Sequence, residues 1–251
     1  MILFAVACFG LIIGSFLNVC IHRLPLGESL VWPASRCPRC KTPLKPYDNI
    51  PVIGYLLLRG RCRSCGNPIA VKYPIVELLT MAVFVAAYVL YPPALMVQRI
   101  VFGCAMIVLF FVDLEHHRLP NEITLPGIVI GFACSFFMPP GWISSLIGIL
   151  AGGGFLWLVG WLWFLIRHEE GMGFGDVKMI AMIGAFLGWQ LMAATLFVST
   201  ILGSLIGVGL IAAKRGNLKT ALPFGCFLAI SAILASVGGN HAVRWYLSLF
   251  P

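Results

Sequence analysis

The chain is dominated by long runs of apolar residues that contain no charged side chain. The longest, from residue 179 to residue 213, has 35 residues, and a helix needs about 20 apolar residues to cross the hydrocarbon core of a bilayer. Charged residues make up only 10% of the sequence, against about 25% in an average soluble domain. This small number of charges cannot cover a globular surface. The sequence therefore predicts an all-α polytopic membrane protein.

The apolar runs, divided at charges and at Pro and Gly breaks, predict about eight transmembrane helices. The first lacks a preceding basic stretch, so we interpret it as a retained span rather than a cleaved signal. The 35-residue run has basic residues at both ends and must cross twice, with a turn expected at Gly188-Trp189-Gln190. Besides these two short spans, the predicted spans are 2–19, 74–90, 95–113, 123–137, 142–166 and 222–237.

The basic residues are distributed unevenly between the loops of this arrangement. Of the 17 Lys and Arg residues, 15 lie in loops that follow odd-numbered spans, and only Arg99 and Arg244 lie on the other side. Since short loops rich in Lys and Arg stay in the cytoplasm, the asymmetry predicts that both termini are periplasmic. The net charge of +8 then reflects basic loops beside a lipid bilayer. No basic stretch interleaved with aromatic residues suggests a nucleic-acid surface.

Four cysteines in the long polar segment 23–73 are arranged as two CxxC pairs. Cys37 and Cys40 form the first pair and Cys62 and Cys65 the second, with 21 residues between the pairs. This arrangement is typical of a tetrahedral zinc site, and four protein ligands leave no open position for water, so the predicted zinc is structural. Two disulfides or four free thiols are the alternatives, and a cytoplasmic location disfavours the disulfides.

Two aspartates stand at the ends of predicted spans. Asp113 ends the third span and Asp176 lies in Gly173-Phe174-Gly175-Asp176, just before the sixth, so the topology brings both to the cytoplasmic face. Charged groups in membrane segments are costly and frequently functional. Two close carboxylates share a proton, so one can act as a base on water and the other as an acid on a scissile carbonyl. The alternative is that each is an ordinary loop acid beside the membrane.

Seven short motifs follow one another along the chain. They are Gly14–Val19 with His22–Pro25, the two CxxC pairs, Asn49–Pro51 with Leu58–Cys62, Tyr73–Thr80, Asp113 with Leu119-Pro120, Gly173–Asp176, and Leu222–Gly225. Each is weak alone, and a Gly-x-Gly-Asp motif also occurs in presenilin-like intramembrane proteases. In this order and at compatible spacing, they resemble the type IV prepilin peptidase family, also called prepilin leader peptidase/N-methyltransferase.

The resemblance implies an activity and a cellular place. Members cut the basic leader from type IV prepilins and pseudopilins after a glycine, at the cytoplasmic face of the bacterial inner membrane, which makes Asp113 and Asp176 the catalytic pair. Many members then methylate the new amino terminus with S-adenosylmethionine, and the cysteine segment is a feature of members expected to do both. Glu77 is the candidate for the methyl-donor half. The alternative is an acid placed favourably near a helix start.

The sequence therefore predicts three parts and leaves two rival functions. Residues 1–22 form a first transmembrane helix, residues 23–73 a cytoplasmic zinc-binding-type domain, and residues 74–251 a transmembrane aspartic peptidase core. One rival is a membrane-anchored zinc module that scaffolds a secretion machine without catalysis. The other is a small transporter with the aspartates as proton carriers, which needs acids near mid-bilayer and repeated spans. The spans show no such repeat.

Overall fold

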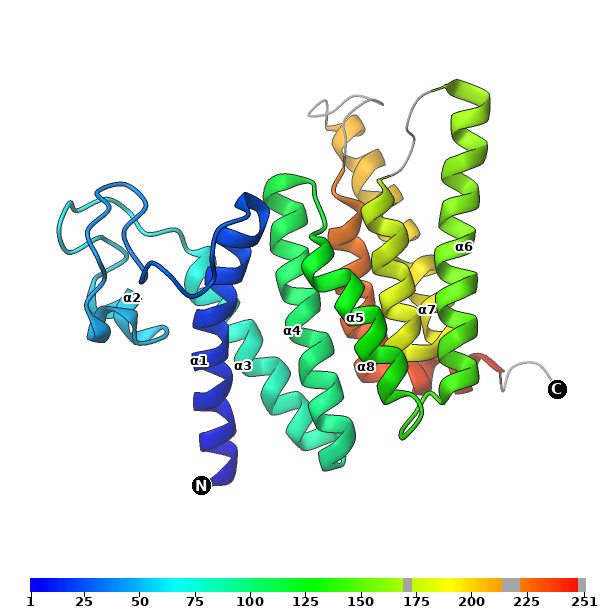
Figure 1. Ribbon diagram of the computed structural model, residues 1–251, viewed down its shortest axis with the longest axis horizontal. Coiled ribbons are helices and arrows are strands. Elements are labelled where there is room, and N and C mark those ends of the chain that lie inside the picture. The colour runs from blue at the N-terminus through cyan, green and yellow to red at the C-terminus, as the bar shows by residue number, and fades with distance from the viewer. Residues whose placement is uncertain (169–172, 214–221, 248–251) are drawn as a thin grey trace. The chain divides into compact units, whose positions relative to one another are not determined.

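The computed structural model describes residues 1–168, 173–213 and 222–247, with only the backbone of residues 240–247 (Figure 1). In these ranges the regular structure consists of helices and two isolated β-bridges, which confirms the all-α prediction. Some residues used in the sequence analysis lie outside the described residues. They are the basic residues Lys214, Arg215 and Lys219, which are among the 15 counted on one side, and the carboxyl terminus.

In the described ranges, five helices are long and apolar enough to cross a membrane. They are α1 (Ile2–Arg23), α3 (Lys72–Leu90), α4 (Pro93–His116), α6 (Trp142–Arg167) and α7 (Phe174–Ala212). Two further helices, α5 (Asn121–Cys134) and α8 (Phe224–Leu247), have shorter apolar stretches. The polar segment holds a short helix α2 (Ile53–Leu57) and two 3-10 turns, η1 (Leu24–Leu26) and η2 (Pro46–Asn49). Each apolar helix overlaps a predicted span, while the count of eight crossings stays a prediction.

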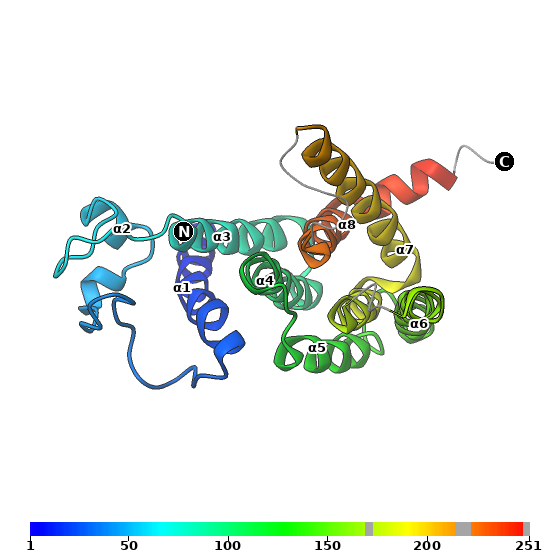
Figure 2. The same ribbon diagram turned by 90° about the horizontal axis from the view of Figure 1, so that it is seen from above.

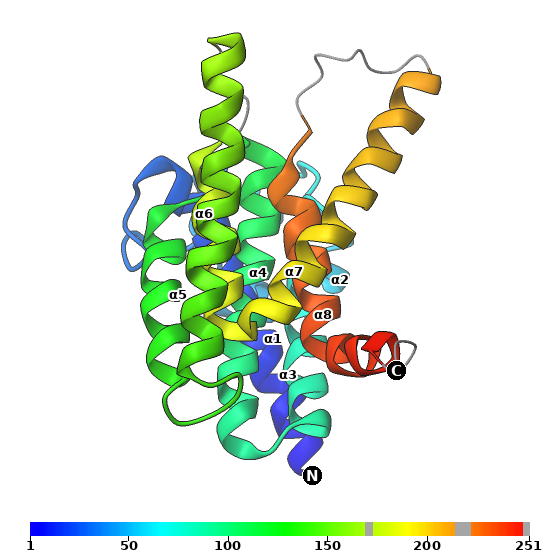
Figure 3. The same ribbon diagram turned by 90° about the vertical axis from the view of Figure 1, so that its right-hand side faces the viewer.

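Helix α7 is broken at Gly188, whose φ of 81° and ψ of 171° are not helical. Glycine adopts a positive φ without the steric cost that a Cβ brings. Figure 3 shows the two parts of α7, yellow-green and yellow to orange, running in different directions. The break falls at the first residue of the turn that the sequence predicts.

The chain forms two compact units, Met1–Val108 and Leu109–Pro251, so α4 contributes to both. In the first unit α1 packs against α3 (Figure 2). A Cβ on Gly10 would lie 2.8 Å from the Cα of Met81, and a Cβ on Gly14 would lie 2.6 Å from the Cα of Glu77. Since small residues four apart let two membrane helices approach closely, these glycines set the α1–α3 contact.

In the second unit the first half of α7 is the central element. Its residues 179–188 are all buried, because α5, α6 and α8 pack around them. Gly148 of α6 lies against Gly184, where a Cβ on Gly184 would come within 2.4 Å of the Gly148 backbone. The Ser145 hydroxyl of α6 donates a hydrogen bond to Ala185 O, at 2.9 Å. This tight packing fixes the helix whose first turn carries Asp176.

Candidate functional site

Asp113 lies near the C-terminal end of α4 and is buried, with 5% of its surface exposed. Its Oδ2 accepts a hydrogen bond from the backbone N–H of Cys226, at 3.1 Å. Cys226 is the third residue of α8, and the positive end of a helix dipole favours a carboxylate there. The Sγ of Cys226 also donates to Phe110 O at 3.3 Å. Cys226 of α8 is thus hydrogen-bonded to two residues of α4, Asp113 and Phe110, which holds the end of α4 to the beginning of α8.

Leu119, in the connection from α4 to α5, is the meeting point of three distant motifs. A Cβ on Gly225 would lie 2.8 Å from Asp113 Oδ2 and 3.2 Å from Leu119 Cδ1. A Cβ on Gly175 would lie 3.0 Å from the Cβ of Leu119. The structure therefore brings the Leu222–Gly225 and Gly173–Asp176 motifs to Asp113, a convergence that spacing along the sequence does not reveal.

Asp176, the third residue of α7, is half-buried. It lies close enough to Asp113 for the two carboxylates to interact electrostatically. Each carboxylate lies at the N-terminal turn of a helix, where backbone N–H groups favour negative charge. Asp176 belongs to the first turn of α7, and Asp113, a residue of α4, lies against the first turn of α8. The Lys178 ammonium donates to Asn121 Oδ1, which ties the first turns of α7 and α5 together beside the pair.

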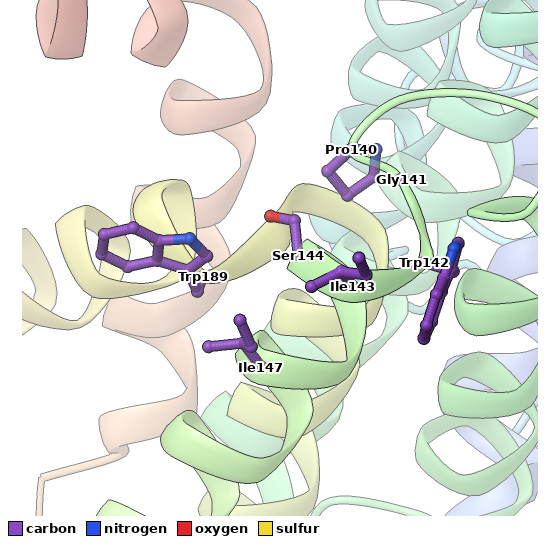
Figure 4. Close-up of a pocket in the computed structure, with 7 residues that line it drawn as sticks. All are labelled: Pro140, Gly141, Trp142, Ile143, Ser144, Ile147 and Trp189. Atoms are coloured by element: carbon purple, nitrogen blue, oxygen red, sulfur yellow. The ribbon is translucent and has the colours of Figure 1, made fainter.

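A separate hollow of about 410 Å³ lies beside the beginning of α6 and the break in α7, far along α7 from Asp176. Trp142 and Trp189 flank it (Figure 4). Trp189 follows Asp176 by 13 residues, which is about 20 Å along a helix. The residues that line the hollow include no acid, cysteine or histidine. This hollow therefore offers no chemistry to the aspartate pair.

The four CxxC cysteines form one compact cluster. Their sulfur atoms all lie within 4.8 Å of one another, and the Cys37–Cys65 and Cys40–Cys62 pairs are each 4.0 Å apart. A tetrahedral zinc ion with bonds of about 2.3 Å to sulfur needs sulfurs about 3.8 Å apart. The cluster therefore fits a metal ion of this kind.

The cluster is built from two copies of one turn, a signal that the sequence analysis did not use. Residues 35–44 and 60–69 align without a gap and share the Arg, both Cys and the Pro of the pattern x-R-C-x-x-C-x-x-P-x. Each copy closes with an isolated bridge, Arg36 to Pro43 and Arg61 to Pro68. The N–H of Cys37 donates to Thr42 O at 3.0 Å, and that of Cys62 to Asn67 O at 2.8 Å.

The thiols of this cluster differ in acidity. Hydrogen bonds from the hydroxyl and then the backbone N–H of Thr42 lower the pKa of Cys40 to about 6. Backbone N–H groups of Cys65 and Ser64 lower the pKa of Cys62. The Asn67 N–H acts to lower the pKa of Cys65, but desolvation and hydrogen bonds shared with the other sulfurs raise it to about 11. Four crowded sulfurs cannot all carry charge unaided, and a bound cation would remove that conflict.

Glu77 occupies a different kind of position. Its side chain is buried, and its Oε2 accepts a hydrogen bond from the Val52 backbone N–H at 2.7 Å. Nearby, Asn18 Nδ2 of α1 donates to Tyr73 O of α3 at 3.1 Å. The carboxylate therefore fastens the polar segment to α3.

Comparison with known proteins gives two family matches and many relatives. Residues 8–91 match the bacterial Peptidase A24 N-terminal domain, and residues 100–208 match the type IV leader peptidase family. The prepilin leader peptidase/N-methyltransferase of Aeromonas hydrophila is 37% identical over 270 residues, which cover 96% of this chain and 92% of the relative. The protein of the same name from Pseudomonas aeruginosa is 35% identical, covering 95% of this chain and 91% of the relative.

The chain belongs to the type IV leader peptidase family. Membership makes it a membrane peptidase. This finding argues against the two alternatives, a scaffold without catalysis and a transporter. The leader peptidase match covers Asp113, Leu119 and Asp176, while the N-terminal match covers the cysteine cluster and Glu77. No solved structure matches this chain.

Proposed function

We propose that this leader peptidase is an aspartic endopeptidase that removes the leader of type IV prepilins or pseudopilins after a glycine, with Asp113 and Asp176 as its catalytic pair. The observation that carries the proposal is the convergence of three separate motifs around Asp113, within one unit of a leader peptidase family member. The relatives named prepilin leader peptidase/N-methyltransferase supply the substrate class.

The surroundings of the two acids support different roles. The Cys226 N–H is placed to stabilise a negative charge on Asp113, because a hydrogen bond to a charged acceptor is stronger than one to a neutral acceptor. Asp113 then takes a proton from water while the water oxygen attacks the scissile carbonyl carbon, and Asp176 gives its proton to the carbonyl oxygen. Collapse of this gem-diol breaks the C–N bond. The proton held by Asp113 passes to the leaving nitrogen, and the diol returns a proton to Asp176.

Glycines on both sides of the pair support access for a peptide backbone. Gly175 and Gly225 flank Leu119 beside the two acids, and a Cβ on Gly225 would collide with the Asp113 carboxylate. Without side chains at these positions, an extended substrate can approach the carboxylates closely.

The test is cleavage of a purified prepilin in detergent by wild type, Asp113→Asn and Asp176→Asn, read as product mass. General acid–base catalysis contributes about 100- to 10,000-fold, so we expect each variant to lose at least about 100-fold. Glu115→Gln is the matched control, since Glu115 lies on the same helix but is exposed. Cleavage at the wild-type rate in either Asn variant would overturn the pair assignment.

The second activity that we propose is N-methylation of the new amino terminus with S-adenosylmethionine as donor. The names of the relatives and the match to the N-terminal domain favour it. A product one methyl group heavier when the donor is added tests it. The described residues do not form a recognisable donor site. Glu77 remains the candidate residue, but its hydrogen bond to Val52 N–H is a positioning contact, so we assign it no chemical step.

We further propose that the cysteine cluster holds a structural zinc ion on the cytoplasmic side of the bacterial inner membrane. The sulfur spacing and the four-cysteine ligand set support zinc without an open coordination position. Cys37, Cys40, Cys62 and Cys65 would be its ligands, and the ion would fasten the two repeated turns to each other. The distribution of basic residues supports periplasmic termini and an aspartate pair at the cytoplasmic face.

A further inference from the structure

Helix α2 presents an apolar surface within the polar segment. Its residues Ile53, Leu56 and Leu57 are 53%, 65% and 74% exposed. The inner side of the helix is occupied by Gly54, which packs so tightly that a Cβ would lie 2.3 Å from Asp48 O. Three large aliphatic side chains side by side on a five-residue helix form an unusual surface for a domain surrounded by water.

The depth of α2 is set by its attachment to a membrane span. Val52, the residue before α2, donates its N–H to Glu77. Glu77 is the sixth residue of α3, a candidate span, so it lies about 7.5 Å along the axis from the first residue of α3. Figure 1 shows α2 at a level between the two ends of α1, not beyond them. The beginning of α2 therefore lies at the depth of the membrane-spanning helices.

Apolar and basic groups around α2 match the two layers of a bilayer surface. On α3, the residues Ile75, Leu78 and Leu79 are 43%, 44% and 44% exposed, so α2 and α3 both present lipid-compatible side chains at this depth. Exposed Arg59 and Arg61 follow α2 directly. Apolar side chains beside Arg residues are typical of segments that lie in the membrane interface, where the Arg side chains contact anionic headgroups.

We infer that α2 is an interfacial membrane helix, whose Ile53, Leu56 and Leu57 contact lipid acyl chains while Arg59 and Arg61 contact anionic headgroups. Part of the segment predicted to be a purely cytoplasmic domain is thus seated in the bilayer surface. The Glu77 carboxylate holds it there, because a buried carboxylate at this depth needs a hydrogen-bond donor and Val52 N–H supplies one. This inference does not depend on the proposed catalytic roles.

Photo-crosslinking tests which molecule covers this surface. Benzoyl-phenylalanine replaces Leu57 in the full chain, which is reconstituted in vesicles of phosphatidylethanolamine and phosphatidylglycerol and irradiated. We expect phospholipid adducts in the mass spectrum, several-fold more abundant than from the same probe at Ser64, an exposed residue between Cys62 and Cys65. Equal adduct yields at the two positions would overturn the inference. So would adducts from position 57 that form only with added prepilin, since they would make this a substrate surface.

A pair of Glu77 variants tests the tether with the probe kept at position 57. Glu77→Gln retains a carbonyl oxygen that can accept the Val52 N–H, whereas Glu77→Ala removes the acceptor. We expect the lipid adduct yield to be kept in Glu77→Gln and to fall several-fold in Glu77→Ala. An unchanged yield in Glu77→Ala would refute the role of Glu77 in setting the depth of α2.

Discussion

The cysteine cluster and the aspartate pair are both small polar sites in an apolar chain, but they are assembled in opposite ways. The cluster joins two copies of one turn, residues 35–44 and 60–69, each closed by its own bridge and hydrogen bonds. The aspartate site joins the ends of helices, and its Asp113–Cys226 hydrogen bond links residues 113 positions apart. One site is local in the sequence, and the other exists only after the helices of its unit have packed.

The two sites also depend on different forces. The turns of the cluster offer four sulfurs to one ion and little apolar packing, so a bound metal would supply most of their mutual attachment. The aspartate pair depends on close backbone contacts, such as Gly148 against Gly184 and Gly225 against Asp113. Removing the metal should therefore disrupt the cysteine cluster and leave the aspartate pair intact. Adding a methyl group at one of these glycines should disrupt the aspartate pair and leave the cluster intact.

The largest effect that we expect is on metal content. Wild type should carry about one zinc per chain, and Cys37→Ser should carry almost none, because three thiolates and a hydroxyl bind zinc far more weakly. Its residues 23–73 should become sensitive to protease at the same time. Elemental analysis of the purified protein, with limited proteolysis, checks both. Cys134→Ser is the control because Cys134 lies outside the cluster. A wild-type protein without zinc would contradict the claim that a metal ion holds the cysteine cluster together.

The same contrast explains what could be predicted from the sequence. The CxxC pairs predict a cluster because a turn of four residues already fixes where its two sulfurs point. The apolar runs predict the helices and the break at Gly188 because span length and glycine conformation are local properties. The small-residue spacings Gly10–Gly14 and Gly148–Gly152 were also available and would have indicated which helix faces pack closely.

The surroundings of the aspartates could not be predicted in this way. Nothing in the spacing of Leu119, Gly175 and Gly225 places them in contact, since that depends on how α5, α7 and α8 pack. The family resemblance indicates that these motifs occur together, but it does not explain that they meet in space. The role of Cys226, whose N–H binds Asp113, gave no signal at all, because a backbone donor can come from almost any residue type.

The second-largest effect concerns the glycine beside Asp113. Gly225→Ala would place a Cβ 2.8 Å from Asp113 Oδ2, so the carboxylate must move. Because a displacement of about 1 Å can cost roughly 100-fold in rate, we expect prepilin cleavage to fall by about that factor with zinc content unchanged. Gly238→Ala is the control on the same helix, since no atom lies within 4 Å of its Cβ position. Unchanged cleavage in Gly225→Ala would argue against an active Asp113.

A smaller effect is expected on stability from the α6–α7 contact. Gly184→Ala would place a Cβ 2.4 Å from the Gly148 backbone, and overpacking of this kind costs about 1–3 kcal/mol. The thermal unfolding midpoint in detergent should fall, with zinc binding unaffected. Gly154→Ala has no atom within 4 Å of its Cβ position and should leave the midpoint unchanged. Equal midpoints for the two variants would show that the helix contact is looser than the structure indicates.

The smallest effect should come from the ion pair between Asp48 and Arg63. It tests whether contacts other than the sulfurs and their metal hold the cysteine cluster together. Arg63 Nη2 lies 2.6 Å from Asp48 Oδ1, and the Arg63 side chain is half-exposed. Hydrogen bonding and charge from Arg63 hold the pKa of Asp48 below its usual range. Such a group adds stability that is complete above its unfolded pKa of about 3.9 and is lost as the pH falls through its lower folded value.

The contribution of this pair should therefore be constant from about pH 6 to pH 8. The Asp48 side chain is 6% exposed, but its Arg63 partner is half-exposed, and an ion pair open to solvent on one side is weak and screened by salt. Asp48→Asn should therefore speed amide hydrogen exchange in residues 60–69 by only about two- to five-fold, and high salt should remove the difference. Exchange in residues 35–44, which do not contain Arg63, serves as the internal reference. An effect as large as that of losing Cys37 would mean that the ion pair, rather than the sulfurs and their metal, holds the two turns together.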